Sequence, residues 1–337
     1  MKRRSSLVFA LVAAAMAMAA PPLPAGTLKD LFAAATQSNQ DYSMFKIDLE
    51  LAQLKKNKGE IEAKVELDRV NAQFAYVSAL AEYRKSVLAF YNEVIDAAFA
   101  AATAEADAAG VGLNLENARE DDKYAESRFR NGLISEEVLK EIDIVLKTVS
   151  ANQEFAAWTL QDAKDNVRLV TGLAWEPKLL PDVPVFEAKA TVDEWIAKDP
   201  ALERARLSEK IAALKTAALA TNASVYDRKI LETESLRARV ATANAESDSR
   251  RAFESALSTL KNQAALLQIR TDEYALKKLT FDDALRQYEK GIISLNDKNL
   301  KAIAVLTAQK NLLAARKSYV KTIGAYLSAI GESPLGF

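Results

Sequence analysis

The sequence contains no cysteine and no histidine among its 337 residues. Without cysteine it can form no disulfide, no thiolate metal site and no lipid anchor at an N-terminal cysteine. Without histidine it lacks the most common general base and metal ligand. Carboxylate-only sites for hard metals and Ser/Lys chemistry stay open in principle, but the chain shows no clustered motif for either. We therefore expect no enzyme activity, no catalytic residues, no cofactor and no bound metal.

Proline is also rare, and its positions divide the chain. The eight prolines are Pro21, Pro22, Pro24, Pro177, Pro181, Pro184, Pro200 and Pro334. Proline inside a helix costs about 3 kcal/mol. The two long stretches without proline, between residues 25 and 176 and between 201 and 333, therefore favour long helices. The central cluster, Trp175 to Pro184, is expected to link two halves.

Neither sign of charge dominates, with 45 basic and 46 acidic residues and a net charge of −1. This balance gives no electrostatic reason to expect a nucleic acid or an acidic substrate. Half of the residues are hydrophobic, and most of these are Ala and Leu. Together with the many Glu, Lys and Arg residues, this composition predicts an all-α fold built from long helices.

The first 25 residues have the pattern of a signal peptide. Lys2, Arg3 and Arg4 precede an apolar run, residues 7–20, and Ala17-Met18-Ala19 offers a small-x-small cleavage site. Leu23-Pro24-Ala25 is a poorer second site. The alternative is an uncleaved membrane anchor, but the run is shorter than the roughly 20 residues that span a bilayer. We expect an exported protein whose mature chain has no transmembrane helix.

Glycine spacing predicts an internal repeat. Gly132 and Gly172 are 40 residues apart, as are Gly291 and Gly331. Each first glycine is followed three residues later by a serine, which is the pattern of a helix end followed by the N-cap of the next helix. The offset of 159 between the two sets predicts a first helical repeat at 26–173, a linker at 174–191 and a second repeat at 192–337.

Each half should then hold three helices. We expect them at 28–57, 60–131 and 136–171, and at 192–221, 224–290 and 295–330. The turns at 57–59 and 222–224 are the weaker predictions, and a continuous helix through either point is an alternative. The middle helix would be about 100 Å long, and the two shorter helices, stacked end to end, would match its length.

Apolar rows on the last helix indicate neighbours on two sides. Three rows repeat every seven residues and cover a wide arc, which exceeds the narrow seam of a two-stranded coiled coil. The rows are Leu306, Leu313, Val320 and Leu327; Val305, Leu312, Tyr319 and Tyr326; and Ala308, Ala315, Thr322 and Ala329. A bundle or helical barrel is therefore expected. The aromatic row Tyr76, Tyr83 and Phe90 is better explained by core packing than by a ligand site.

These features together resemble the TolC family of outer-membrane efflux proteins. The family's tip turn reads aromatic-x-x-Gly-x-x-Ser-x-x-Asp, and residues 129–135 and 288–297 match it, except that Val138 replaces the aspartate in the first copy. Asp199-Pro200-Ala201-Leu202 is similar to the family's Asn-Pro-x-Leu, with Ser38-Asn39-Gln40 as a weaker counterpart. The resemblance covers essentially the whole chain after the signal peptide.

The resemblance implies partners and sites. It implies a homotrimer in the periplasm, associated with the outer membrane, that docks a periplasmic adaptor and works with an inner-membrane transporter. By position, the candidate adaptor contacts are Gly132, Leu133, Ser135, Gly291, Ile292 and Ser294. Asp297 corresponds to an acidic ring that constricts the tunnel in some relatives. Turn chemistry alone would explain the glycines and serines, and a helix-dipole role would explain Asp297.

The chain departs from the family where relatives insert two β-strands per repeat that form a membrane barrel. Residues 52–66 and 215–232 show no alternating segment of the 9–11 residues that such strands need. A separate outer-membrane barrel is therefore a further candidate partner. The first functional hypothesis is a tunnel component of an efflux or secretion assembly. The second is a helical spacer or tether in the envelope that transports nothing.

Overall fold

The computed structural model describes residues 28–177, 180, 183, 186–219 and 222–336. The predicted signal peptide lies outside these residues. The described chain is all-α, as expected, and contains no strand. Its helices are α1 (Leu28–Ser38), α2 (Gln40–Glu62), α3 (Glu66–Arg130), α4 (Glu136–Thr171), α5 (Val192–Lys198), α6 (Pro200–Ala217), α7 (Val225–Glu289) and α8 (Leu295–Ala329), followed by the short 3-10 helix η2 (Pro334–Gly336).

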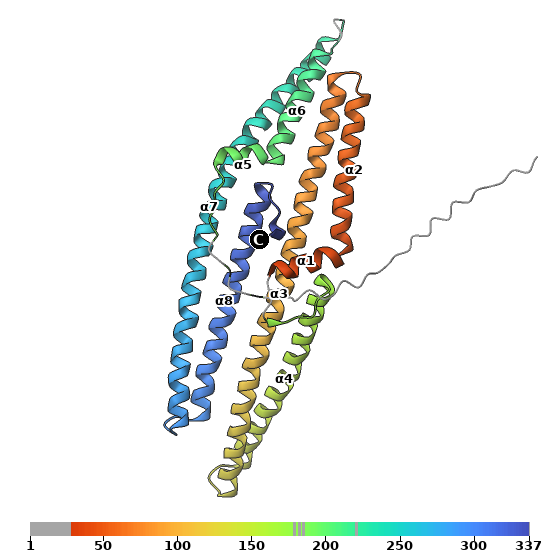
Figure 1. The fold of residues 1–337 in the computed structure, drawn as a ribbon. Coiled ribbons are helices and arrows are strands. Elements are labelled where there is room, and N and C mark those ends of the chain that lie inside the picture. Colours follow the sequence, from red (N-terminus) through yellow and green to blue (C-terminus); the bar gives the residue numbers. More distant parts are fainter. Residues whose placement is uncertain (1–27, 178–179, 181–182, 184–185, 220–221, 337) are drawn as a thin grey trace, which may run out of the picture.

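The helices form an elongated single layer (Figure 1). The two 65-residue helices, α3 and α7, run nearly its full length. Along α3, α2 packs against one half and α4 against the other, while α6 and α8 divide α7 in the same way. Both α6 and α8 also contact α3. The order across the layer is therefore α7, then α6 and α8, then α3, then α2 and α4.

This arrangement confirms the expectation that two short helices share one long neighbour. It also confirms that the last helix has neighbours on two sides, because α8 packs against both α7 and α3. Within the described chain, the helices of the second half follow those of the first at a nearly constant interval. Helix α7 begins and ends 159 residues after α3, and α8 begins 159 residues after α4.

Three predicted boundaries were wrong. The first predicted helix breaks at Asn39, whose side chain accepts a hydrogen bond from the N–H of Tyr42 and caps α2. The fourth breaks at Asp199, which caps α6 ahead of Pro200 at the first helical position. The first turn lies at residues 63–65 rather than 57–59, where the Asp68 carboxylate accepts hydrogen bonds from two turn N–H groups.

Gly59 lies inside α2 because the two helices of this hairpin approach closely. A Cβ on Gly59 would lie 2.8 Å from the Cβ of Ala72 on α3. The residue therefore serves packing between helices and does not end one. The second predicted turn, at 222–224, is confirmed at its end, where Ser224 caps α7.

The core lies at mid-length, where the layer is thickened. There α1, the end of α4 and the segment after it cover α3 and α8, and α5 with residues 186–190 covers α7 and α8. Phe90 is buried in this core, with Tyr83 packed against it, and Tyr76 packs in a smaller cluster nearer the end. The predicted aromatic row therefore serves packing.

One described helix, α3, is long and apolar enough by composition to cross a membrane. However, 56% of its most apolar window is buried inside the fold, as expected of a helix that packs against α1, α2, α4, α6 and α8. At residues 52–66 the chain is helix and turn.

Candidate partner interface

The two tip turns, Asn131–Ser135 and Lys290–Ser294, lie at the same end of the layer (Figure 1). In each, a glycine with positive φ ends the long helix: Gly132 has φ 70° and Gly291 has φ 68°. The residue after each glycine donates a backbone hydrogen bond back into the helix, Leu133 to Arg128 O and Ile292 to Gln287 O, both at 2.9 Å. This closes the Schellman motif that satisfies the last carbonyls of a helix.

Each tip turn presents one apolar side chain to solvent. Leu133 is 65% exposed and Ile292 is 66% exposed. A Cβ placed on Gly132 or Gly291 would meet nothing within 4 Å. The backbone at each tip is therefore ordered by local hydrogen bonds, while its outer surface is free for a partner to approach.

The serines of the two turns both act as N-caps, but their surroundings differ. The Ser135 hydroxyl accepts from the N–H of Val138 at 3.4 Å, and the Ser294 hydroxyl accepts from that of Asp297 at 3.1 Å. In the second turn the Asp297 carboxylate also accepts from the Ser294 hydroxyl and N–H, which completes a capping box. These bonds, that of the hydroxyl first, lower the pKa of the Asp297 carboxyl below its ordinary value.

Asp297 is thus bound into its own turn. The structure gives its carboxylate a capping role, and the predicted role at a tunnel constriction stays a prediction. The same holds for the six tip residues as adaptor contacts: the structure brings them to one end of the layer in two similar turns and shows what each does within its turn.

The seam between the two halves contains a polar pair that the sequence did not reveal. Asn299, near the start of α8, is fully buried. Its Nδ2 donates to Asn117 Oδ1 at 2.8 Å and to Glu116 Oε2 at 3.2 Å. Two asparagines 182 residues apart give no pattern in the sequence, and only the register of α3 against α8 brings them together.

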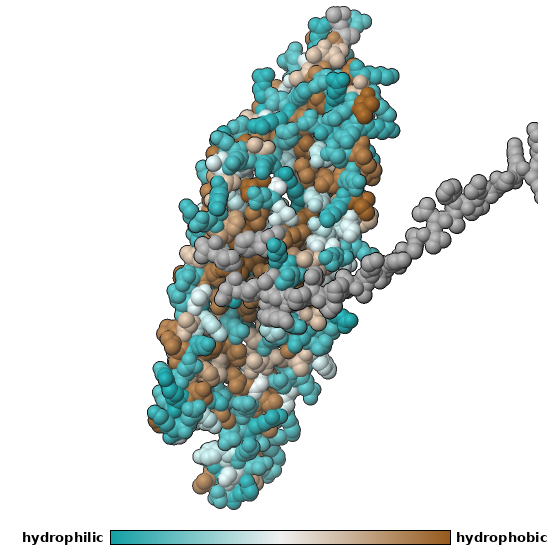
Figure 2. Space-filling model, in the orientation of Figure 1, coloured by the Kyte–Doolittle hydropathy of each residue, from teal (hydrophilic) through white to brown (hydrophobic). Residues whose placement is uncertain are grey.

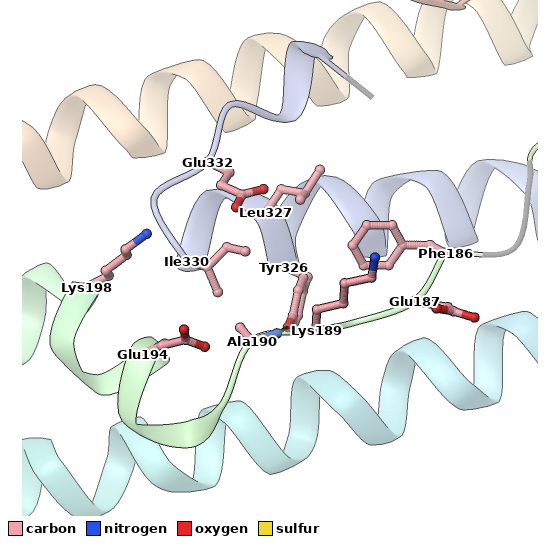
Figure 3. Close-up of a pocket in the computed structure, with 10 residues that line it drawn as sticks. All are labelled: Phe186, Glu187, Lys189, Ala190, Glu194, Lys198, Tyr326, Leu327, Ile330 and Glu332. Atoms are coloured by element: carbon pink, nitrogen blue, oxygen red, sulfur yellow. Dashed lines mark hydrogen bonds between the residues drawn. The ribbon is translucent and has the colours of Figure 1, made fainter.

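A cleft of about 630 Å³ lies between α5, residues 186–190 and the end of α8 (Figure 3). Its polar groups are already engaged in holding the fold. The Tyr326 hydroxyl accepts a hydrogen bond from the N–H of Ala190, and burial raises the pKa of this hydroxyl. Hydrogen bonds from the Thr191 N–H and hydroxyl lower the pKa of the Glu194 carboxyl. No group of acidic residues in the described chain is arranged to hold a metal ion.

Structural comparison identifies the fold. The chain is similar to the Campylobacter jejuni CmeC outer-membrane channel, with a TM-score of 0.57 and 12% identity over 92% of this chain and 86% of that one. It is similar to the outer-membrane protein VceC from Vibrio cholerae (0.57, 15%, 91% and 96%). The open state of the Neisseria gonorrhoeae MtrE outer-membrane channel gives 0.57 and 13% over 91% and 89%.

The chain has the TolC-like helical fold of outer-membrane channels. No protein-family model matches the sequence, and no curated protein matches it. At 12–15% identity the likeness is one of backbone arrangement. The solved structures to which this TolC-like fold is similar are described as channels, not as enzymes.

Proposed function

We propose that copies of this chain close into a helical tunnel in the cell envelope and that its tip turns dock a periplasmic adaptor of an efflux or secretion assembly. The proposal includes two tandem helical units, a cleaved signal peptide and a periplasmic location. The observation that carries it is that the chain is an open layer of helices with two unpaired edges.

Helix α7 forms the first edge. Of its 65 residues, only Ser249, Leu260 and Ala284 are buried. Leu260 and Leu267 pack towards α8, whereas Ile269 and Leu276 lie on the opposite side of the helix at 100° per residue and are 59% and 61% exposed. An amphipathic helix with apolar residues on two opposite sides is expected to have a helix on each side.

Helices α2 and α4 form the second edge. Apolar side chains are exposed along both of them: Met44, Ile47, Leu51 and Leu54 on α2, and Ile144, Phe155 and Trp158 on α4. Trp158 is 73% exposed, and it lies on the opposite side of α4 from Val167, which is buried against the core. Hydrophobic residues show at the surface over the edge of α2 and over the tip-end half of α7 (Figure 2).

The two edges are different surfaces, so pairing them is heterologous. A heterologous contact repeated around an axis produces a closed ring when the rotation closes. The curved, single-layer form of the chain suits such a ring, with the layers as its wall. The resemblance to TolC-like channels supplies the number, three copies, and the adaptor as the partner at the tips.

The deciding measurement is the mass of the exported protein in detergent-free solution by light scattering, followed by electron microscopy of the particles. Three copies around a central opening are expected. A strictly monomeric protein would contradict the tunnel and leave the spacer hypothesis.

Adaptor docking is tested by placing a photo-reactive residue at Leu133 or Ile292 in cells, with Lys64 at the far end as the matched control position. Cross-links to a periplasmic adaptor are expected from the two tip positions and not from the control. Equal cross-linking from all three positions would contradict docking at the tips.

A further inference from the structure

The end of the layer opposite the tip turns carries most of the highly exposed apolar side chains. Ile61, Tyr226 and Val225 are 85%, 82% and 80% exposed, and among the large hydrophobic residues of the described chain only Leu169 is comparable. Val65 is 57% exposed. Ile61 and Val65 belong to the turn between α2 and α3, and Val225 and Tyr226 begin α7. We call these four residues the distal apolar set.

The distal apolar set sits at the outermost turns of the layer, beyond its packed flanks (Figure 1). The nearest buried cluster, Val70, Val77 and Leu207, lies further along the helices. Pairing the α7 edge with the α2 and α4 edge of another copy joins the long sides of the layer. A ring built in that way leaves its ends uncovered, so tunnel formation does not account for the set.

We propose that this end docks on a lipid bilayer, with the distal apolar set inserted at the boundary between headgroups and acyl chains. Four apolar side chains on two turns are too few to span a bilayer, which needs about 20 residues in a helix. They suit shallow insertion, which scales with the apolar area buried at the interface. Tyr226 has the amphipathic ring that is enriched at that depth.

The charges around the set are those of an interfacial surface. Lys58 and Lys229 flank it with side chains that are 71% and 77% exposed, and Lys64 is exposed in the turn itself. Long lysine side chains can leave their stems among apolar groups while the ammonium reaches the headgroups. Residues 55–66, 215–219 and 222–232 hold seven basic and five acidic residues, whereas the whole chain has a net charge of −1.

The shape of this end favours lipid over a protein. The side chains project from two narrow turns, and a protein partner would need a separate recess for each. A fluid surface adapts to both. A second copy placed end to end would bring the lysines of one copy against those of the other, which is unfavourable.

The absence of cysteine allows a direct test, because a single introduced thiol is labelled without competition. Lys64→Cys places an environment-sensitive dye in the distal turn, and Lys290→Cys places it in a tip turn as the control. Each protein, purified after export, is mixed with vesicles of phosphatidylethanolamine and phosphatidylglycerol. A blue shift with increased emission is expected at position 64 and no change at position 290.

Substitution of the set measures its contribution. The double variant Ile61→Ser/Tyr226→Ser is expected to lower the vesicle partition coefficient at least about tenfold, because both side chains are lost from the interface. Leu300→Ser removes an exposed apolar side chain near the tips and should bind as the parent does. Circular dichroism verifies that all variants keep their helices. Neutral phosphatidylcholine vesicles measure the contribution of the lysines.

A position-64 dye that does not respond to vesicles, or a double variant that binds as well as the parent, would overturn the proposal. So would an end-to-end dimer whose formation, rather than vesicle addition, shifts the dye emission. The test uses no adaptor and does not depend on the number of copies. Failure of lipid docking is therefore distinguishable from failure of the proposed tunnel.

Discussion

The ring of Tyr91 on α3 occupies the space beside Gly324 on α8. A Cβ on Gly324 would lie 2.2 Å from Cε1 of that ring. The ring stacks on Phe32 with centroids 4.8 Å apart, and its hydroxyl donates to Val320 O at 2.9 Å. Burial raises the pKa of this hydroxyl far above its ordinary value. At this point α1, α3 and α8 pack together, so the contact joins the two halves of the chain.

Gly324→Ala should therefore destabilise the protein. The added methyl group must displace a fully buried ring, and such overpacking typically costs about 1–3 kcal/mol. Urea unfolding followed by circular dichroism measures the change. Gly110→Ala is the matched control, because it is also a helical glycine that faces α8. There the added Cβ would meet Leu306 Cδ1 at 3.8 Å, and the gain in helix propensity should stabilise by roughly 0.5–1 kcal/mol. Equal destabilisation by both would contradict the prediction.

The buried pair Asn117 and Asn299 predicts coupling between the two halves near the tips. Replacing either asparagine by leucine leaves a buried amide without this partner, at a cost of about 1–3 kcal/mol. Replacing both removes the unmet need, so the double variant should lose less than the sum of the two single losses, by at least about 0.5 kcal/mol. Urea unfolding of the four proteins in the cycle measures this. Strict additivity would show that the two side chains do not interact.

The tip turns could be predicted from the sequence because their determinants are local. Gly132 and Gly291 end helices through their own φ angles, and Ser135 and Ser294 cap the next helices through their own hydroxyls. The turn at residues 63–65 has neither glycine nor proline, and a carboxylate three residues beyond it fixes the backbone. The breaks at Asn39 and Asp199 did carry a signal, a capping side chain that at Asp199 is followed by proline, but the helical periodicity on both sides hid it.

The open layer was not predictable for a different reason. Whether an amphipathic helix faces one neighbour or two depends on contacts between residues far apart in the chain. The sequence gives Ile269 and Leu260 the same apolar character, and only the position of α8 makes one exposed and the other buried. The Asn117–Asn299 pair depends in the same way on the register of α3 against α8.

The capping box of the second tip turn predicts a pH dependence at the start of α8. The folded-state pKa of Asp297 is lowered by the hydrogen bonds from Ser294. Its contribution is therefore present above the unfolded-state value, near pH 4, and is lost as the pH falls through the folded-state value. Amide hydrogen exchange at residues 297–299, corrected for intrinsic rates, should show loss of protection at acid pH. In Asp297→Asn this local change should be absent, and its persistence there would assign it to another group.

The α7 edge predicts how the assembly is broken. Ile269 and Leu276 lie on the side of α7 away from α8 and contact no apolar cluster of their own chain. Ile269→Glu/Leu276→Glu should leave the helical content and the urea midpoint unchanged, because both positions are exposed in the single chain. In a ring the two carboxylates would face Phe155 and Trp158 of the next copy, and the loss of apolar burial should raise the dissociation constant by at least about a hundredfold. Light scattering over a range of concentrations measures this constant. Leu300→Glu, an exposed leucine away from either edge, should assemble as the parent does, and a double variant with unchanged mass would show that α7 is not an assembly surface.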